Sequence, residues 1–70
     1  MTEQIRQIAA RIKEIREISG ISAETLAQKI GLDADLYNRY ESGDIDIPVG
    51  IVFQISELFN VELSVLLGGD

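Results

Sequence analysis

Residues 22–43, SAETLAQKIGLDADLYNRYESG, decide how this chain is expected to fold. Ser22 can cap a helix, because its hydroxyl accepts hydrogen bonds from the unpaired N–H groups of a first turn. Leu26 and Ile30 then recur at one-turn spacing on one face. Gly31 suits the left-handed backbone conformation that ends many helices. The stretch therefore begins with one short helix that closes on a glycine turn.

A second short helix is expected directly after this turn. Asp33 can cap it, and Leu36, Tyr37 and Tyr40 fall on one face of it. It stops near residues 42–43, where a serine and a glycine follow each other. Two short helices with a tight glycine turn between them have the outline of a helix-turn-helix, whose second helix can enter a DNA major groove.

The flanking segments predict three further helices. Isoleucines at alternating steps of three and four make an apolar stripe over residues 2–18, and Thr2 can cap this helix. Pro48 suits the first turn of a helix over residues 48–60, where its missing N–H costs nothing. A short last helix is expected over residues 62–67.

The predicted fold is all-α: a compact five-helix bundle containing a helix-turn-helix over about residues 22–43. Residues 44–47 alternate polar and apolar side chains, but with no partner strand in sight we expect a loop. We expect residues 1–70 to form a single domain, with residues 68–70 as a frayed end or the stub of a linker. Seventy residues are near the lower limit for a self-sufficient core.

Composition excludes several function classes. The chain contains neither Cys nor His, so disulfides, thiolate metal sites and the usual general bases are absent. No apolar run approaches the roughly 18 residues of a membrane-spanning helix, and the polar N-terminus lacks the apolar core of a signal peptide. We therefore expect a cytoplasmic protein with no membrane association, no metal, no cofactor and no enzymatic activity.

The charge distribution is asymmetric. Six Lys and Arg stand against twelve Asp and Glu, for a net charge of −6. Residues 1–30 are slightly positive, whereas residues 31–70 contain Arg39 as their only basic residue, against eight acids. The acidic half includes the second helix of the motif, and this argues against phosphate binding there.

Several short motifs within residues 20–48 carry a family resemblance that extends over nearly the whole chain. They are Gly20-Ile21-Ser22, Leu26-Ala27, Gly31-Leu32, Tyr40-Glu41-Ser42-Gly43 and Pro48. With them, residues 8–67 resemble the lambda-repressor-like helix-turn-helix domains, the XRE family of bacterial and phage regulators. The aromatic-Glu-x-Gly ending of the second motif helix, followed by a proline, is the most specific part. The closing segment, YESGDIDIPVGIVFQISELFNVELSVLLGG, is similar to XRE regulators whose longer members continue into a C-terminal cupin domain that senses a ligand.

The resemblance implies double-stranded DNA as the partner and a homodimer that contacts two half-sites about one helical turn apart. In this family the start of the first motif helix touches phosphate, and the first turn of the second meets base edges. The DNA-facing residues carried over to this chain are Ser22, Ala23, Asp33, Ala34, Asp35, Asn38 and Arg39.

The side chains at these positions differ in how well they suit DNA. Arg39 can bind guanine bidentately or hold a phosphate, and Asn38 can pair with adenine. Ser22 can donate to a phosphate oxygen. Asp35 can accept from a cytosine amino group but repels phosphates. The alternative is that Asp33 and Asp35 only cap and charge the helix N-terminus, and it is favoured more strongly for Asp33 than for Asp35.

The chain also departs from the family pattern. Ala23 stands where many relatives have glutamine, so one polar contact is absent. Asp44 and Asp46 occupy a loop where many relatives carry Lys or Arg. The resemblance further implies an ion pair between Arg16 and Glu41, which would brace the first helix against the end of the second motif helix. The alternative is two solvated charges worth about 0–1 kcal/mol.

Two functions remain open on the sequence. The first is a DNA-binding domain of a transcriptional regulator. The second is an acidic helix-turn-helix fold used as a protein-interaction or dimerisation module, docking through apolar residues around Ile51, Phe53 and Val65. An enzyme is the weakest class, because the inventory of nucleophiles and bases is nearly empty.

Overall fold

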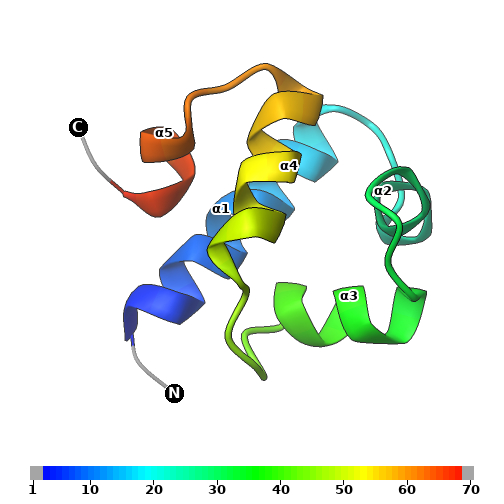
Figure 1. Cartoon of the computed structure of the whole chain (residues 1–70), viewed down its shortest axis with the longest axis horizontal. Coiled ribbons are helices and arrows are strands. Elements are labelled where there is room, and N and C mark those ends of the chain that lie inside the picture. Colours follow the sequence, from blue (N-terminus) through cyan, green and yellow to red (C-terminus); the bar gives the residue numbers. More distant parts are fainter. Residues whose placement is uncertain (1–2, 69–70) are drawn as a thin grey trace.

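The computed structural model describes residues 3–68, which form five helices and no β-strand (Figure 1). The helices are α1 (Glu3–Ile18), α2 (Ala23–Lys29), α3 (Ala34–Glu41), α4 (Val49–Phe59) and α5 (Leu63–Leu67). The predicted all-α bundle is confirmed. The proposed cap at Thr2 and residues 69–70 lie outside the described residues.

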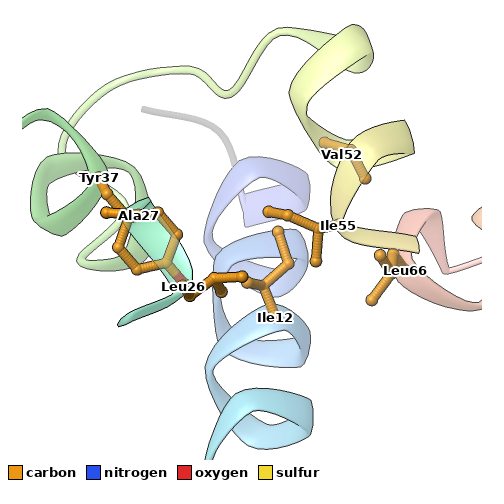
Figure 2. Packing of buried hydrophobic residues seen from close by; sticks show 7 residues of the cluster. All are labelled: Ile12, Leu26, Ala27, Tyr37, Val52, Ile55 and Leu66. Atoms are coloured by element: carbon orange, nitrogen blue, oxygen red, sulfur yellow. The ribbon is translucent and has the colours of Figure 1, made fainter. Parts of the chain in front are cut away.

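The core lies against one face of α1, between the helix-turn-helix and the two C-terminal helices. In Figure 2, Ile12 of α1 separates two groups of side chains: Tyr37, Ala27 and Leu26 from the helix-turn-helix, and Ile55, Val52 and Leu66 from α4 and α5. These seven side chains are at most 1% exposed. Helix α1 packs against α3 and α5, α2 against α3, and α4 against α5. The isoleucine stripe predicted on α1 therefore joins the motif to the two C-terminal helices.

The boundaries of α4 and α5 differ slightly from those predicted. Pro48 is the N-cap of α4 with an extended ψ of 142°, so the helix itself begins at Val49. Glu62 likewise precedes α5 as its N-cap. Asn60 ends α4 in the left-handed conformation, with φ 56°, as its small polar side chain permits. One residue more or less at a helix end leaves the packed faces unchanged.

Gly68 ends α5. Its N–H donates to the carbonyl oxygen of Ser64, and it adopts φ 89°. The guanidinium of Arg11 lies so close that a methyl group on Gly68 would be 2.8 Å from one of its nitrogens. The C-terminal helix is therefore held against α1 up to this residue.

The segment between α3 and α4 is a loop, as predicted. Ile47 packs against the core from within it, while Asp44 and Asp46 are exposed. In Figure 1 this loop lies below the body of the molecule, at the same edge as α3.

In the described part of the chain, no helix is both long and apolar enough to cross a bilayer. Nor do three or more acidic side chains gather, among residues 3–68, in a way that suits a metal ion.

Candidate nucleic-acid interface

Helix α2 begins at the cap that the sequence indicated. The Ser22 Oγ accepts from the Thr25 N–H at 3.0 Å and donates to the Thr25 Oγ1 at 2.9 Å. The cap is thereby confirmed, but its hydroxyl proton is engaged within the motif. A phosphate contact from Ser22 would have to replace the bond to Thr25.

The turn between α2 and α3 is closed by backbone hydrogen bonds. The Gly31 N–H donates to the carbonyl oxygen of Gln28 at 3.2 Å, and the Leu32 N–H donates to the carbonyl oxygen of Ala27 at 2.9 Å. Gly31 adopts φ 76°, a conformation that only glycine reaches without strain. Leu32 packs against the core from the turn. Helix α2 is seen nearly end-on in Figure 1 while α3 runs across the page, so this turn sets the two helices at a steep angle.

The two aspartates at the start of α3 differ in their surroundings. The Asp33 carboxylate accepts from the N–H groups of Asp35 and Leu36 at 3.0 and 3.4 Å. Its role is the capping that was the alternative for this residue. The exposed Asp35 side chain makes no hydrogen bond or ion pair within residues 3–68, so it is available to a ligand.

Helix α3 divides into an inner and an outer face. Tyr37 and Tyr40 are 1% and 9% exposed and anchor it to the body. Asn38 and Arg39 are exposed on the other face. The side chains with the chemistry for base or phosphate contact are thus open to solvent.

The two alanines are less accessible than the polar residues of the predicted set. Ala23 is half-buried and packs against the core cluster, and Ala34 is also half-buried. Neither offers a hydrogen-bonding side chain. The structure therefore leaves Asp35, Asn38 and Arg39 as the free polar side chains of the predicted surface, beside the engaged Ser22 and Asp33.

The end of α3 is fixed by an ion pair with α1. The Arg16 Nε donates to the Glu41 Oε2 at 2.8 Å, and a second guanidinium nitrogen donates to Oε1 at 2.8 Å. The third nitrogen of Arg16 donates to the Ile21 carbonyl oxygen at 2.8 Å. The two side chains are only 12% and 10% exposed. One guanidinium thus joins α1, the turn before α2 and the last residue of α3.

Tyr37 completes this network, which sequence reasoning missed. Its hydroxyl donates to the Glu41 Oε2, from one turn earlier on the same helix. The spacing of Tyr37 and Glu41 could have indicated this contact, since side chains four residues apart on a helix are neighbours. Tyr37 was predicted on the inner face of this helix, but its hydroxyl was given no partner, although a buried tyrosine hydroxyl normally has one.

The pKa shifts of the network follow from this geometry. Burial alone would raise the pKa of Glu41, but the hydrogen bonds from Arg16 and Tyr37 outweigh it, so the pKa is lowered. The hydrogen bond to Glu41 raises the pKa of Arg16. Burial, together with the bond to Glu41, raises the pKa of the Tyr37 phenol well above its ordinary value. At neutral pH the three groups are an arginine cation, a carboxylate and a neutral phenol.

A comparison with protein-family models identifies the fold. The helix-turn-helix model HTH_3 matches residues 12–66, which is most of the chain. The chain belongs to the helix-turn-helix family. The lambda-repressor-like (XRE) resemblance is confirmed, and with it a DNA-binding regulatory role rather than the interaction-module alternative.

A solved structure supports the same assignment. This helix-turn-helix chain is similar to the restriction-modification controller protein C.AhdI from Aeromonas hydrophila, with a TM-score of 0.84 and 25% sequence identity. The match covers 93% of this chain and 98% of that one. No curated protein sequence matches this chain significantly.

Proposed function

We propose that this helix-turn-helix protein regulates transcription by inserting α3 into the major groove of its operator. The observation that carries this proposal is the exposure of Asn38 and Arg39 on a helix whose opposite face is anchored by two buried tyrosines. A helix presented in this way fits a groove about 12 Å wide. The ion pair between Arg16 and Glu41 fixes the angle at which it is presented.

Three free side chains are assigned to the DNA bases in this proposal. Asn38 pairs with adenine, and Arg39 binds either guanine or a phosphate. Asp35 accepts from a cytosine amino group, which makes it a selective residue rather than a source of affinity. Asp33 caps α3 through its carboxylate and is assigned no base contact in this proposal. Ser22 and Ala23 lie at the α2 end of the surface and meet the phosphate backbone.

The same proposal includes a homodimer formed through α4 and α5. Phe53 and Val65, on these two packed helices, are 48% and 49% exposed. Ile51 does not belong to this surface, because it is half-buried against the core. Two copies joined here would present two copies of α3 to half-sites about one helical turn apart. A Phe53→Asp variant is expected to be monomeric by light scattering and to bind the operator less tightly.

Further parts of the proposal concern the cellular setting. We place the protein in the cytoplasm, where bacterial-type regulators meet DNA, and assign it no enzymatic activity. A C-terminal sensor domain would supply the effector response if the natural chain continues past Asp70.

Amide chemical shifts test the proposal directly. The full chain is titrated at low salt with a mixed-sequence DNA duplex, while the backbone amides are followed by NMR. We expect shifts at Ser22, Asn38 and Arg39, with little change at Lys29, which lies beside α4 in a shallow hollow. If the amide shifts of α3 do not change, and the only shifts are concentration-dependent ones on α4 and α5, the proposal is wrong and the domain self-associates instead of binding DNA.

A further inference from the structure

Arg6, on α1, lies directly against the end of α3. Gly43 follows α3 and is buried, with φ 80°. A methyl group on Gly43 would lie 3.5 Å from the Cγ of Arg6 and 3.8 Å from its Cα. The stem of Arg6 therefore passes over Gly43, just after the end of α3.

The guanidinium of Arg6 has no protein partner among residues 3–68. Arg6 is an exposed residue, and its side chain makes no hydrogen bond or ion pair in this part of the chain. Long cationic side chains commonly lay their stems on the protein and keep the charge in water. Arg16 differs, since its three nitrogens are all engaged by Glu41 and Ile21.

The loop that starts at Gly43 needs a cation if it is to approach DNA. It contains the exposed Asp44 and Asp46 but neither Lys nor Arg. A helix lying in the major groove has a phosphate backbone on each side, so the loop at its end meets one of them. Two exposed carboxylates there would be repelled by the phosphates.

We propose that Arg6 supplies the phosphate contact at this end of the interface. This inference deepens the proposed function and rests on it. Arg6 comes from α1, outside the helix-turn-helix, and its fork of N–H donors suits bidentate binding of a phosphate. Gly43 then serves twice, because it ends α3 and also allows the stem of Arg6 to cross beside the acidic loop.

The salt dependence of binding tests this assignment. The full chain is titrated into a fluorescently labelled mixed-sequence duplex, and anisotropy is measured between about 50 and 200 mM KCl. Loss of one phosphate contact reduces the slope of log K against log salt by about 0.9. Arg6→Gln keeps most of the stem over Gly43 but removes the charge. The ratio of the wild-type binding constant to that of Arg6→Gln should therefore be about 3.5-fold smaller at 200 mM than at 50 mM KCl. Arg6→Lys should retain most of the slope.

Lys29→Ala is the matched control. It removes one positive charge from an exposed residue at the end of α2, beside Gln54 and Glu57 of α4 and away from Gly43. Circular dichroism confirms that each variant is folded before binding is measured. We expect Lys29→Ala to lower affinity only slightly and to leave the salt slope close to that of the wild type.

The outcomes separate this inference from the function on which it rests. If Arg39→Ala weakens binding while Arg6→Gln behaves like Lys29→Ala, Arg6 is not a phosphate contact and α3 remains the DNA-binding helix. If Arg6→Gln lowers the slope but Arg39→Ala does not weaken binding, the cation of α1 contacts DNA and the proposed docking of α3 is wrong. A wild-type chain without measurable binding at low salt would overturn both.

Discussion

Replacing Arg16 by methionine removes the cationic half of the brace between α1 and α3 while keeping an unbranched stem. The substitution deletes three hydrogen bonds, two to Glu41 and one to the Ile21 carbonyl oxygen, each 2.8 Å long. It leaves the Glu41 carboxylate, only 10% exposed, with the Tyr37 hydroxyl as its remaining partner. The stability of the fold should therefore fall well beyond the effect of losing a surface charge.

The size of the effect follows from the burial of the pair. Removing one partner of a fully buried pair destabilises a protein by about 3–5 kcal/mol, whereas an exposed pair contributes about 0–1 kcal/mol. Because residual exposure lets some water reach Glu41, we expect a loss of about 2–4 kcal/mol. For a domain of this size, each kcal/mol lowers the melting temperature by about 4–8 °C, so the melting temperature of Arg16→Met should be roughly 8–32 °C lower than that of the wild type.

Urea and thermal unfolding followed by circular dichroism at pH 7 measure this loss. Arg39→Met is the matched control, because Arg39 is exposed and unpaired within residues 3–68, and its effect should stay within about 0.5 kcal/mol. A charge-swapped pair, Arg16→Glu with Glu41→Arg, should recover part of the stability. If Arg16→Met unfolds like the control, or if the swap recovers nothing, the brace does not hold α3 in solution.

Three further predictions concern the same end of α3. The pKa of Glu41 is lower in the folded state than the value of about 4.3 expected for the unfolded chain. The stability that ionised Glu41 contributes is therefore present above the unfolded-state pKa and is lost as the pH falls through the folded-state pKa. Over this pH range, Glu41→Gln should make the unfolding free energy depend less on pH. Tyr37→Phe removes the hydroxyl that donates to Glu41 and should lower the unfolding free energy by about 1–2 kcal/mol at pH 7. Because the pKa of the Tyr37 phenol is raised in the folded state, the stability of the wild type falls as the pH rises above about 10, where the phenol of the unfolded chain ionises. In urea titrations at alkaline pH, Tyr37→Phe should not show this fall in stability. Gly43→Ala should destabilise the fold by about 1–2 kcal/mol, because residue 43 has a positive φ. Gly50→Ala should stabilise it by about 0.5–1 kcal/mol, because residue 50 lies inside α4 with open space around it. Equal changes in the free energy of unfolding in urea would contradict this explanation from backbone conformation.

Most of the fold was predictable because its signals are local. The capping residues Ser22 and Asp33 and the turn glycine Gly31 mark helix ends through bonds to neighbours two or three residues away. Apolar spacing then indicated the buried faces of the first three helices. Helix boundaries erred by a residue at Pro48 and Glu62, because a cap and a first helical residue share the same preferences.

The parts that were missed depend on contacts between distant segments. Nothing in the local pattern indicates that Arg6 crosses Gly43 or that Arg11 lies against Gly68, since those approaches arise only when α1 packs on both ends of the chain. The Arg16 partner was inferred from family resemblance, not from spacing. The third member, Tyr37, needed the buried position of its hydroxyl beside Glu41.

The acidic net charge of the chain bears on how a domain of this kind reaches useful affinity. With Arg39 as the sole cation in residues 31–70 and Asp44 and Asp46 beside it, the proposed interface neutralises few phosphates. Little counterion release means weak non-specific binding and a shallow salt dependence. In the proposed complex, selectivity comes from the base contacts of α3. Affinity comes from the proposed homodimer, in which the second half-site would be bound at high effective concentration. An acidic regulator of this design loses little of its population to bulk DNA, so its net charge and its DNA-binding role are compatible.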